Sequence, residues 1–232
     1  MIFRRPKTII AHRGAPELAR ENTLESFSIA VESGAHMIEF DLRKTVDGSI
    51  VLHHDPYISF QGIDYNLGTI THKELNSIAG KKSYTVPAFT DVLQMFSGKT
   101  NFDIEIKESG YEEEITEIVD KFLKRQEYIF TSFNISVVNK LKQISEENSV
   151  GLLVENSELL MEYSSAEVDL FCPSKSLYTS HKDFFTSVHK RGLSIAVWTV
   201  NSDKLLETLI SDPCVDAIIT NRCRRALRLL NN

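Results

Sequence analysis

Residues 101–154 decide the fold, and they read NFDIEIKESGYEEEITEIVDKFLKRQEYIFTSFNISVVNKLKQISEENSVGLLV. Three short apolar runs, at 101–106, 128–131 and 150–154, have the length and composition of buried strands. Two longer segments with helical spacing, 111–125 and 135–146, separate them. Strict strand–helix alternation predicts parallel strands that are joined by crossover helices.

The same alternation extends from this stretch toward both ends of the chain. Further strands are expected at 8–11, 37–42, 168–171, 194–200 and 217–220. Further helices are expected after a cap at Asn22 or Thr23 and at 90–96, 157–163, 182–191, 202–210 and 222–230. Eight such units close most naturally into one (β/α)8 TIM barrel over residues 1–232, with a small insertion at about 57–88 after the second strand. An open doubly wound sheet is the alternative, but no GxGxxG follows the first strand.

Composition excludes some classes of function. The formal net charge of −6 offers no basic excess for binding nucleic acid, although it leaves room for a small anionic substrate. The N-terminus has basic residues but no long apolar run after them, so neither a signal peptide nor a stable membrane insertion is expected. A cytoplasmic location is the resulting expectation, and the oligomeric state stays open.

Asp47-Gly48 is a strong signal for a two-residue hairpin turn between strand-like runs. If these two residues form the turn, Asp41 pairs with His54 across the ribbon and His53 faces the other way. The pairing predicts that His54, and not His53, lies beside Asp41.

In a barrel of this kind, the active site lies at the carboxyl ends of the strands. Glu39 and Asp41 end the second strand and, two residues apart, point the same way; Glu105 ends the strand at 101–106. Three converging carboxylates repel one another unless a hard divalent cation lies between them, so they are candidate metal ligands. The alternative for each of them is a solvated strand edge or an ion pair. Oxygen ligands favour one Ca²⁺ or Mg²⁺ ion, with Mn²⁺ also possible, over zinc.

His12 and His54 are the candidate acid/base pair, because imidazole titrates near neutral pH. Arg13 and Lys107 place positive charge beside the carboxylates, either as their ion-pair partners or to hold a phosphate. A metal site, two histidines and basic groups together indicate phosphoryl chemistry without a covalent serine or cysteine.

Phe133 and Trp198 are candidates for an apolar wall beside a small alcohol group. Phe133 directly follows a strand end, which favours the site, whereas core packing is an equally good explanation for Trp198.

Taken in order, these motifs resemble the glycerophosphodiester phosphodiesterases. The strings that carry the resemblance are His12-Arg13-Gly14, Glu21-Asn22-Thr23, Glu39-x-Asp41, Thr45-x-Asp47-Gly48, His54-Asp55, Ile104-Glu105-Ile106-Lys107, Val197-Trp198-Thr199-Val200-Asn201 and residues 216–222. They span nearly the whole chain, and the ordered set is specific although each string alone is weak.

The resemblance implies a (β/α)8 barrel that hydrolyses a small phosphodiester, with a divalent metal, to an alcohol and glycerol 3-phosphate. It implies the same roles for the residues above: His12 and His54 in acid/base catalysis, the three carboxylates on the metal, and the two basic groups on phosphate. It also implies attack by the substrate's own neighbouring hydroxyl through a cyclic phosphate.

Two departures from the family pattern bear on the site. Asp103 stands where the family tends to have Asn, and residues 57–83 lack the usual Arg- and Gly-rich sequence. Two alternatives therefore remain open: a phosphodiesterase for lysophospholipids or another phosphodiester, and a non-catalytic barrel that binds a phosphodiester.

Overall fold

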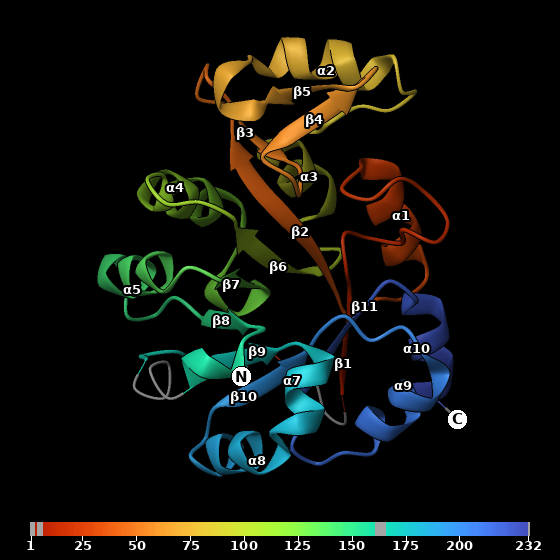
Figure 1. Ribbon diagram of the computed structural model, residues 1–232, viewed down its shortest axis with the longest axis vertical. Helices are drawn as coiled ribbons and strands as arrows, with labels where there is room; N and C mark the ends of the chain where they lie inside the picture. The colour runs from red at the N-terminus through yellow and green to blue at the C-terminus, as the bar shows by residue number, and fades with distance from the viewer. Residues whose placement is uncertain (1–2, 4–6, 161–165, 232) are drawn as a thin grey trace.

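The computed structural model describes residues 3, 7–160 and 166–231 and shows alternating strands and helices (Figure 1). The strands are β1 (Thr8–Ala11), β2 (Met37–Lys44), β3 (Ile50–Leu52), β4 (Tyr57–Phe60), β5 (Ile63–Asn66), β6 (Asn101–Ile106), β7 (Tyr128–Ser132), β8 (Val150–Val154), β9 (Leu170–Pro173), β10 (Ser194–Val197) and β11 (Ala217–Thr220). The helices are α1 (Leu24–Glu32), α2 (His72–Gly80), α3 (Phe89–Phe96), α4 (Glu112–Phe122), α5 (Ile135–Ile144), α7 (Lys175–Ser180), α8 (Lys182–Lys190), α9 (Asp203–Ile210) and α10 (Cys223–Leu230). Short 3-10 turns are η1 (Leu67–Thr69), η2 (Arg125–Glu127) and η3 (Ser157–Leu159).

The parallel strands form a closed barrel, which confirms the expected fold class. Their order is β1, β11, β10, β9, β8, β7, β6 and β2, and β2 pairs again with β1 through Ile10–Met37 and Ala11–Ile38. Closure leaves no free edge among these strands, and it brings the carboxyl ends of all of them to one mouth.

Two apolar layers hold the barrel together. Side chains such as Phe40, Ile104 and Phe130 point outward and pack beneath the helices. Ile10, Met37 and Leu153 belong to a separate cluster on the other face of the strands, which fills the interior. Successive side chains of a strand point to the two layers in turn. Because both layers are buried, the strands appear in the sequence as continuous apolar runs.

Several element boundaries differ from the expected ones. The strand expected at 168–171 lies at 170–173, and the strand expected at 194–200 ends at Val197. Helix α7 was not expected, and only the turn η3 is described within the helix expected at 157–163, whose last residues lie outside the described part. Thr23, not Asn22, is the N-cap of α1, since its side chain accepts from the backbone N–H of Ser26.

The insertion is more regular than its sequence indicates. It contains the antiparallel pair β4–β5 and the helix α2, whose start is stabilised by a capping box between Thr71 and Glu74. A small cluster of its own, including Ile58 and Leu75, holds these elements together. In Figure 1 they gather at one end of the molecule, beyond β2 and β3.

The expected register of the β2–β3 hairpin is wrong by one residue. Arg43 pairs with Val51, and Thr45 N–H donates to Ser49 O at 3.0 Å, so the loop has three residues instead of two. Gly48, with φ of +81°, supplies the left-handed position that such a loop requires.

The histidine opposite Asp41 is consequently His53, whose N–H donates to Asp41 O at 3.0 Å. His54 reaches the site for a different reason. Strand β3 ends at Leu52, and the chain then turns, which carries the His54 side chain to the cavity described below.

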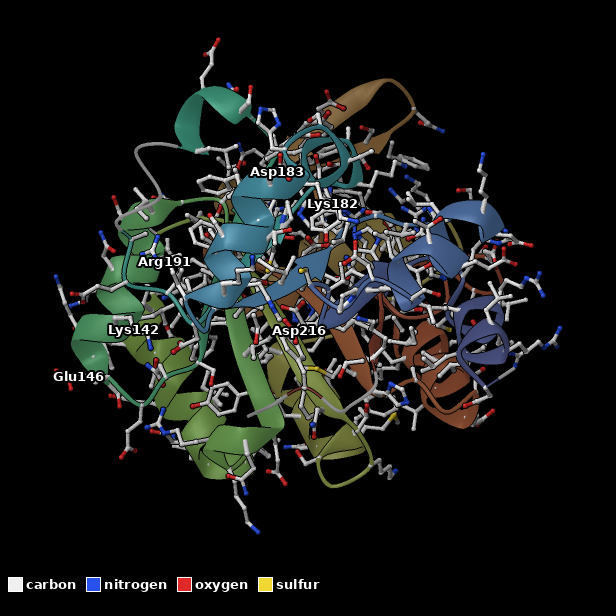
Figure 2. All side chains as sticks on the ribbon, turned by 90° about the horizontal axis from the view of Figure 1, so that it is seen from below. Lys142, Glu146, Lys182, Asp183, Arg191 and Asp216 are labelled. Atoms are coloured by element: carbon white, nitrogen blue, oxygen red, sulfur yellow. The ribbon has the colours of Figure 1, made fainter. Side chains whose placement is uncertain are left out.

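Charged side chains at the amino ends of the strands are paired with one another. Lys142 lies 2.7 Å from Asp169, which precedes β9, and His189 lies 3.3 Å from Asp216, which precedes β11. Figure 2, which views the molecule from below relative to Figure 1, labels Lys142, Lys182 and Asp216 among other charged residues. These pairs tie helices to the starts of strands.

No helix in the described part of the chain is long and apolar enough to cross a membrane.

Candidate active site

The loop after β1 sets the position of His12 and Arg13 at the barrel mouth. Gly14 has φ of +87°, and a Cβ there would collide with Ser26, so only glycine lets this loop pack against α1. Ser26 also fixes the loop by hydrogen bonds, since its Oγ accepts from Ala15 N–H at 2.7 Å and donates to Arg13 O at 3.0 Å. The first two predicted site residues are therefore held on a rigid turn.

The three predicted carboxylates come together at the carboxyl ends of β2 and β6. Asp41 and Glu105 are direct partners in the parallel ladder, and Glu39 lies two residues before Asp41 on the same face. All three are buried, and one oxygen from each lies within 4.8 Å of the others. Glu39 Oε2 accepts from Arg13 N–H at 2.8 Å, while the buried Glu39 Oε1 has no hydrogen-bond partner within residues 3, 7–160 and 166–231.

Burial and mutual repulsion decide the protonation of this cluster. Burial, then Asp41 and Glu105, raise the pKa of Glu39 well above its usual value. Burial and Asp41 likewise raise the pKa of Glu105 to about 8. Burial opposes ionisation of Asp41 too, but Arg13 and Lys107 outweigh it and lower the pKa of Asp41 to about 2. Without an added positive charge, the protein can therefore keep only part of the cluster ionised at neutral pH.

Arg13 and Lys107 both contact the carboxylates. Arg13 Nε lies 3.1 Å from Asp41 Oδ2, and Arg13 Nη1 lies 3.2 Å from Glu21. Lys107 Nζ lies 2.6 Å from Glu105 and 3.3 Å from Asp41 Oδ1. Both also line the main cavity, so the ion-pair role and the phosphate-binding role that the sequence left open are compatible in space.

The two histidines have different surroundings. His12 is largely buried, and burial together with Arg13 lowers its pKa to about 4, which makes the ring neutral at physiological pH. Its Nδ1 donates to Asn221 Oδ1 at 2.6 Å, so Nε2 carries the free lone pair and lies 4.0 Å from Glu39. His54 is more open, and its Nδ1 donates to the Asp55 carboxylate at 2.8 Å.

A cavity of about 190 Å³ is lined by every site residue that the sequence predicted except Asp41. Its apolar side holds Phe133 and Trp198, whose rings meet edge to face with centroids 5.3 Å apart. Trp198 also packs against the interior cluster, and its indole N–H donates to Cys172 O at 2.6 Å. Trp198 thus belongs to the core and to the cavity wall at once.

Several residues of the site were missed by the sequence reasoning or were not assigned a role, among them the following four. Asn22 Nδ2 donates to Asp41 Oδ2 at 2.8 Å, and Asn221 orients His12. Thr131 and Glu155 line the cavity. Glu155 directly follows β8, so the strand-end rule that found Glu105 could have found it too; the contacts of Asn22 and Asn221 have no local sequence signal.

The departure at Asp103 lies beneath the cluster. Asp103 is buried, and its Oδ1 accepts from Thr131 Oγ1 at 2.7 Å. Burial raises its pKa to about 7, although the Thr131 hydrogen bond opposes the shift. A fourth carboxyl group therefore lies next to the three candidate ligands.

Comparison with known proteins agrees with this geometry. A family model described as the glycerophosphoryl diester phosphodiesterase family matches residues 12–225. A glycerophosphodiester phosphodiesterase of Caldanaerobacter subterraneus is 26% identical over 227 residues, which cover 92% of this chain and 93% of the relative. A lysophospholipase D of Mus musculus is 24% identical over 168 residues, covering 66% of this chain and 51% of that protein.

A solved structure shares the fold. It is an Oleispira antarctica phosphodiesterase in complex with the product sn-glycerol-3-phosphate, with a TM-score of 0.84, 22% sequence identity and coverage of 97% of each chain. The family match spans nearly all of the sequence, and the barrel gathers the family's polar motifs at one mouth. This chain therefore belongs to the glycerophosphoryl diester phosphodiesterase family and is an enzyme that hydrolyses glycerophosphodiesters.

Proposed function

We propose that the enzyme cleaves glycerophosphodiesters to an alcohol and glycerol 3-phosphate with a divalent metal ion and two histidines as acid and base. One observation carries the proposal. Three buried carboxylates within 4.8 Å of one another, one with an unpartnered oxygen, lie in the same mouth as two imidazoles.

Glu39, Asp41 and Glu105 would hold the ion. Their hard oxygen donors suit Ca²⁺ or Mg²⁺, with Mn²⁺ as a further possibility. The buried Glu39 Oε1 is an acceptor that no described group satisfies, which fits a cation at this place. When bound, such an ion neutralises charge on the phosphate and makes a coordinated hydroxyl more acidic.

Arg13 and Lys107 are proposed to bind the phosphate. Both already line the cavity, and both are balanced by carboxylates that a metal ion would neutralise in their place. Each would then have charge and N–H donors to offer to the non-bridging phosphate oxygens. The guanidinium and the ammonium thereby orient phosphorus between the two histidines.

His12 is proposed as the base of the first step. Its ring is neutral at physiological pH, and the Asn221 hydrogen bond leaves Nε2 free to accept a proton. The proton comes from the 2-hydroxyl of the glycerol arm, whose oxygen attacks phosphorus. No serine, threonine or cysteine of this chain is required as the nucleophile.

His54 is proposed as the acid of the same step. Its Nδ1 is engaged with Asp55, so Nε2 is the nitrogen that can give a proton to the departing alcohol oxygen as the phosphorus–oxygen bond breaks. The cyclic phosphate that results is then opened by water with the two roles reversed, which yields glycerol 3-phosphate.

The experiment is a panel of glycerophosphodiesters incubated with the chelator-treated protein and with each metal in turn. Release of glycerol 3-phosphate that depends on added Ca²⁺, Mg²⁺ or Mn²⁺ is expected. Equal release in the presence of excess chelator contradicts the metal requirement. Tight binding of diesters without turnover under every condition would support the non-catalytic alternative.

A second substrate class is a lysophospholipid. The observations that favour it are the apolar wall of Phe133 and Trp198 and the printed name of the mouse relative. Comparing rates on lysophosphatidylcholine and glycerophosphocholine separates the two classes, because only an enzyme with room for an acyl chain turns over the first.

A further inference from the structure

Glu155 is an acidic side chain of the cavity that the proposed mechanism does not use. It lines the cavity and is exposed, and no ion pair or hydrogen bond of its side chain is recorded among the described residues. The other carboxylates of the cavity wall, Glu39, Asp103 and Glu105, are buried and have partners or lie in the metal cluster. Among the residues that the structure describes, Glu155 thus has no partner that compensates its carboxylate at the outer part of the site.

Strand register fixes where this charge lies. Val154 pairs with Pro173 in β9, and Ser174 N–H donates to Val154 O at 2.8 Å, so Glu155 is level with Ser174. Ser174 in turn forms an isolated bridge with Trp198. Glu155 and Trp198 are therefore at the same height on the barrel, two strands apart.

The direction of the side chain follows from alternation along β8. Leu153 belongs to the interior cluster, and Val154 belongs to the layer beneath the helices. Glu155, two residues after Leu153, points to the interior side and above it. Its carboxylate and the Trp198 ring therefore face the same end of the cavity.

Phe133 completes this end of the site. Its ring is 41% exposed and packs edge to face on Trp198, and Lys107 Nζ already lies 5.7 Å from its centroid. Exposed aromatic faces beside a carboxylate form a setting that attracts an alkylammonium group by cation–π and charge interactions together. The charge of Lys107 is offset there, because two carboxylates contact its ammonium group.

We infer that Glu155, with Phe133 and Trp198, makes this site select glycerophosphodiesters whose alcohol is a cationic amino alcohol. The inference rests on the proposed function. The glycerol arm must keep its 2-hydroxyl beside the carboxylate cluster and His12, so the other arm of the diester is the one free to reach the aromatic end. A quaternary ammonium fits this end best, and a primary ammonium fits next.

The test compares four diesters of glycerol with the metal-loaded enzyme: the choline, ethanolamine and glycerol compounds, and the 3,3-dimethylbutanol compound, which is a neutral isostere of the choline one. The wild-type enzyme is expected to have the highest kcat/KM for the choline compound. The isostere keeps shape and removes charge, so its KM should be higher by about three- to fivefold, the size expected for a solvent-exposed charge pair.

Glu155→Gln should reduce that difference by raising KM for the choline and ethanolamine diesters about two- to fivefold, while the cation–π part that Phe133 and Trp198 supply is kept. Its effect on KM should be smaller for the two neutral diesters than for the two cationic ones. Glu158→Gln is the matched control, because Glu158 is an exposed residue of the same loop that does not line the cavity.

The outcomes separate the two proposals. Hydrolysis of no diester with any metal overturns the proposed function itself. If the wild-type enzyme hydrolyses all four diesters with similar KM, only the role of Glu155 is overturned. The same holds if Glu155→Gln changes KM for all four diesters by the same factor. A loss of the charge preference in Glu158→Gln as well would also contradict it.

Discussion

The two ends of the barrel differ in how closely their acidic groups are matched by basic ones. At the amino ends of the strands, each acid has its own basic partner within 2.7–3.3 Å: Asp169 with Lys142, Asp212 with Lys182, and Asp216 with His189. At the mouth, three buried carboxylates, Glu39, Asp41 and Glu105, lie within 4.8 Å of one another and share the two cations Arg13 and Lys107. In the described part of the chain, one oxygen of Glu39 and one of Asp41 have no hydrogen-bond partner.

The difference separates charges that stabilise the fold from charges that cost stability. An ion pair near the surface adds at most about 1 kcal/mol to the free energy of unfolding. Its contribution to stability is then a sufficient explanation for the acid at that position. Buried like charges are unfavourable, and their presence points to a ligand that compensates them. The four predictions below test this contrast, beginning with the largest effect.

Replacing either mouth histidine should nearly abolish turnover. His12→Ala and His54→Ala are each expected to lower kcat by about 10²–10⁴-fold, because each removes one proton transfer. The measurement is glycerol 3-phosphate release at saturating metal, with circular dichroism to verify folding. His189→Ala, at the opposite end, is the control and should keep kcat within twofold of the wild-type value, roughly the scatter of such assays. Equal losses in all three variants would contradict the assignment.

Neutralising one acid at each end should change stability in opposite directions. Glu39→Gln relieves repulsion and should raise the free energy of unfolding of the metal-free protein by about 1–3 kcal/mol at pH 8. Asp212→Asn weakens contacts with Lys182 and Tyr178 and should lower it by about 1–3 kcal/mol. Urea unfolding in excess chelator measures both.

The metal supplies the matched control for this pair of variants. Added Ca²⁺ or Mg²⁺ should raise the Tm of the wild-type protein and of Asp212→Asn, but not that of Glu39→Gln. A metal-induced rise of equal size in Glu39→Gln would show that Glu39 does not hold the ion.

The stability of the metal-free protein should fall as the pH rises from about 5 to 8. The folded-state pKa of Glu105 is about 8, above its ordinary value, so the folded state holds a proton that the unfolded state has lost across this window. Glu39 acts in the same direction. Asp212, whose pKa is lowered, loses its contribution only when the pH falls below the ordinary range of an aspartate. Thermal unfolding at several pH values, with and without metal, measures how Tm depends on pH. The ion should make this dependence weaker. A Tm that rises with pH in the metal-free protein contradicts the protonation argument.

The smallest effect is expected from the pair at the amino ends. Lys142→Met should lower the free energy of unfolding by about 1 kcal/mol or less, because Asp169 is half exposed and well solvated when unpaired. Catalytic constants should not change. A reduced kcat would mean that the Lys142–Asp169 pair affects the active site at the other end of the barrel.

The sequence predicted the architecture well because the pattern is local. The apolar pattern that predicts each strand or helix lies within about 5–15 consecutive residues, and strict alternation of strands and helices leaves few possible topologies. The closed barrel and the family membership are confirmed. Convergence of Glu39, Asp41 and Glu105 also followed from the strand-end rule, and the structure brings them together, while their role as ligands stays a prediction.

The hairpin shows where local inference fails. Asp47-Gly48 correctly marks a turn, yet Thr45 N–H donates to Ser49 O, and the resulting shift of one residue puts His53 instead of His54 opposite Asp41. Turn residues alone do not distinguish a two-residue from a three-residue loop, because glycine satisfies the left-handed position in both.

By itself, then, the sequence determined that eight strand–helix units alternate and that acids, bases and histidines follow particular strand ends. Only the tertiary structure decided which of these groups come together: Asn221 hydrogen-bonds to His12, Asn22 hydrogen-bonds to Asp41, and Glu155 lines the same cavity as Phe133 and Trp198. Contacts of this kind join residues that closure of the barrel brings side by side. Their proximity depends on strand register and order, which no window of sequence contains.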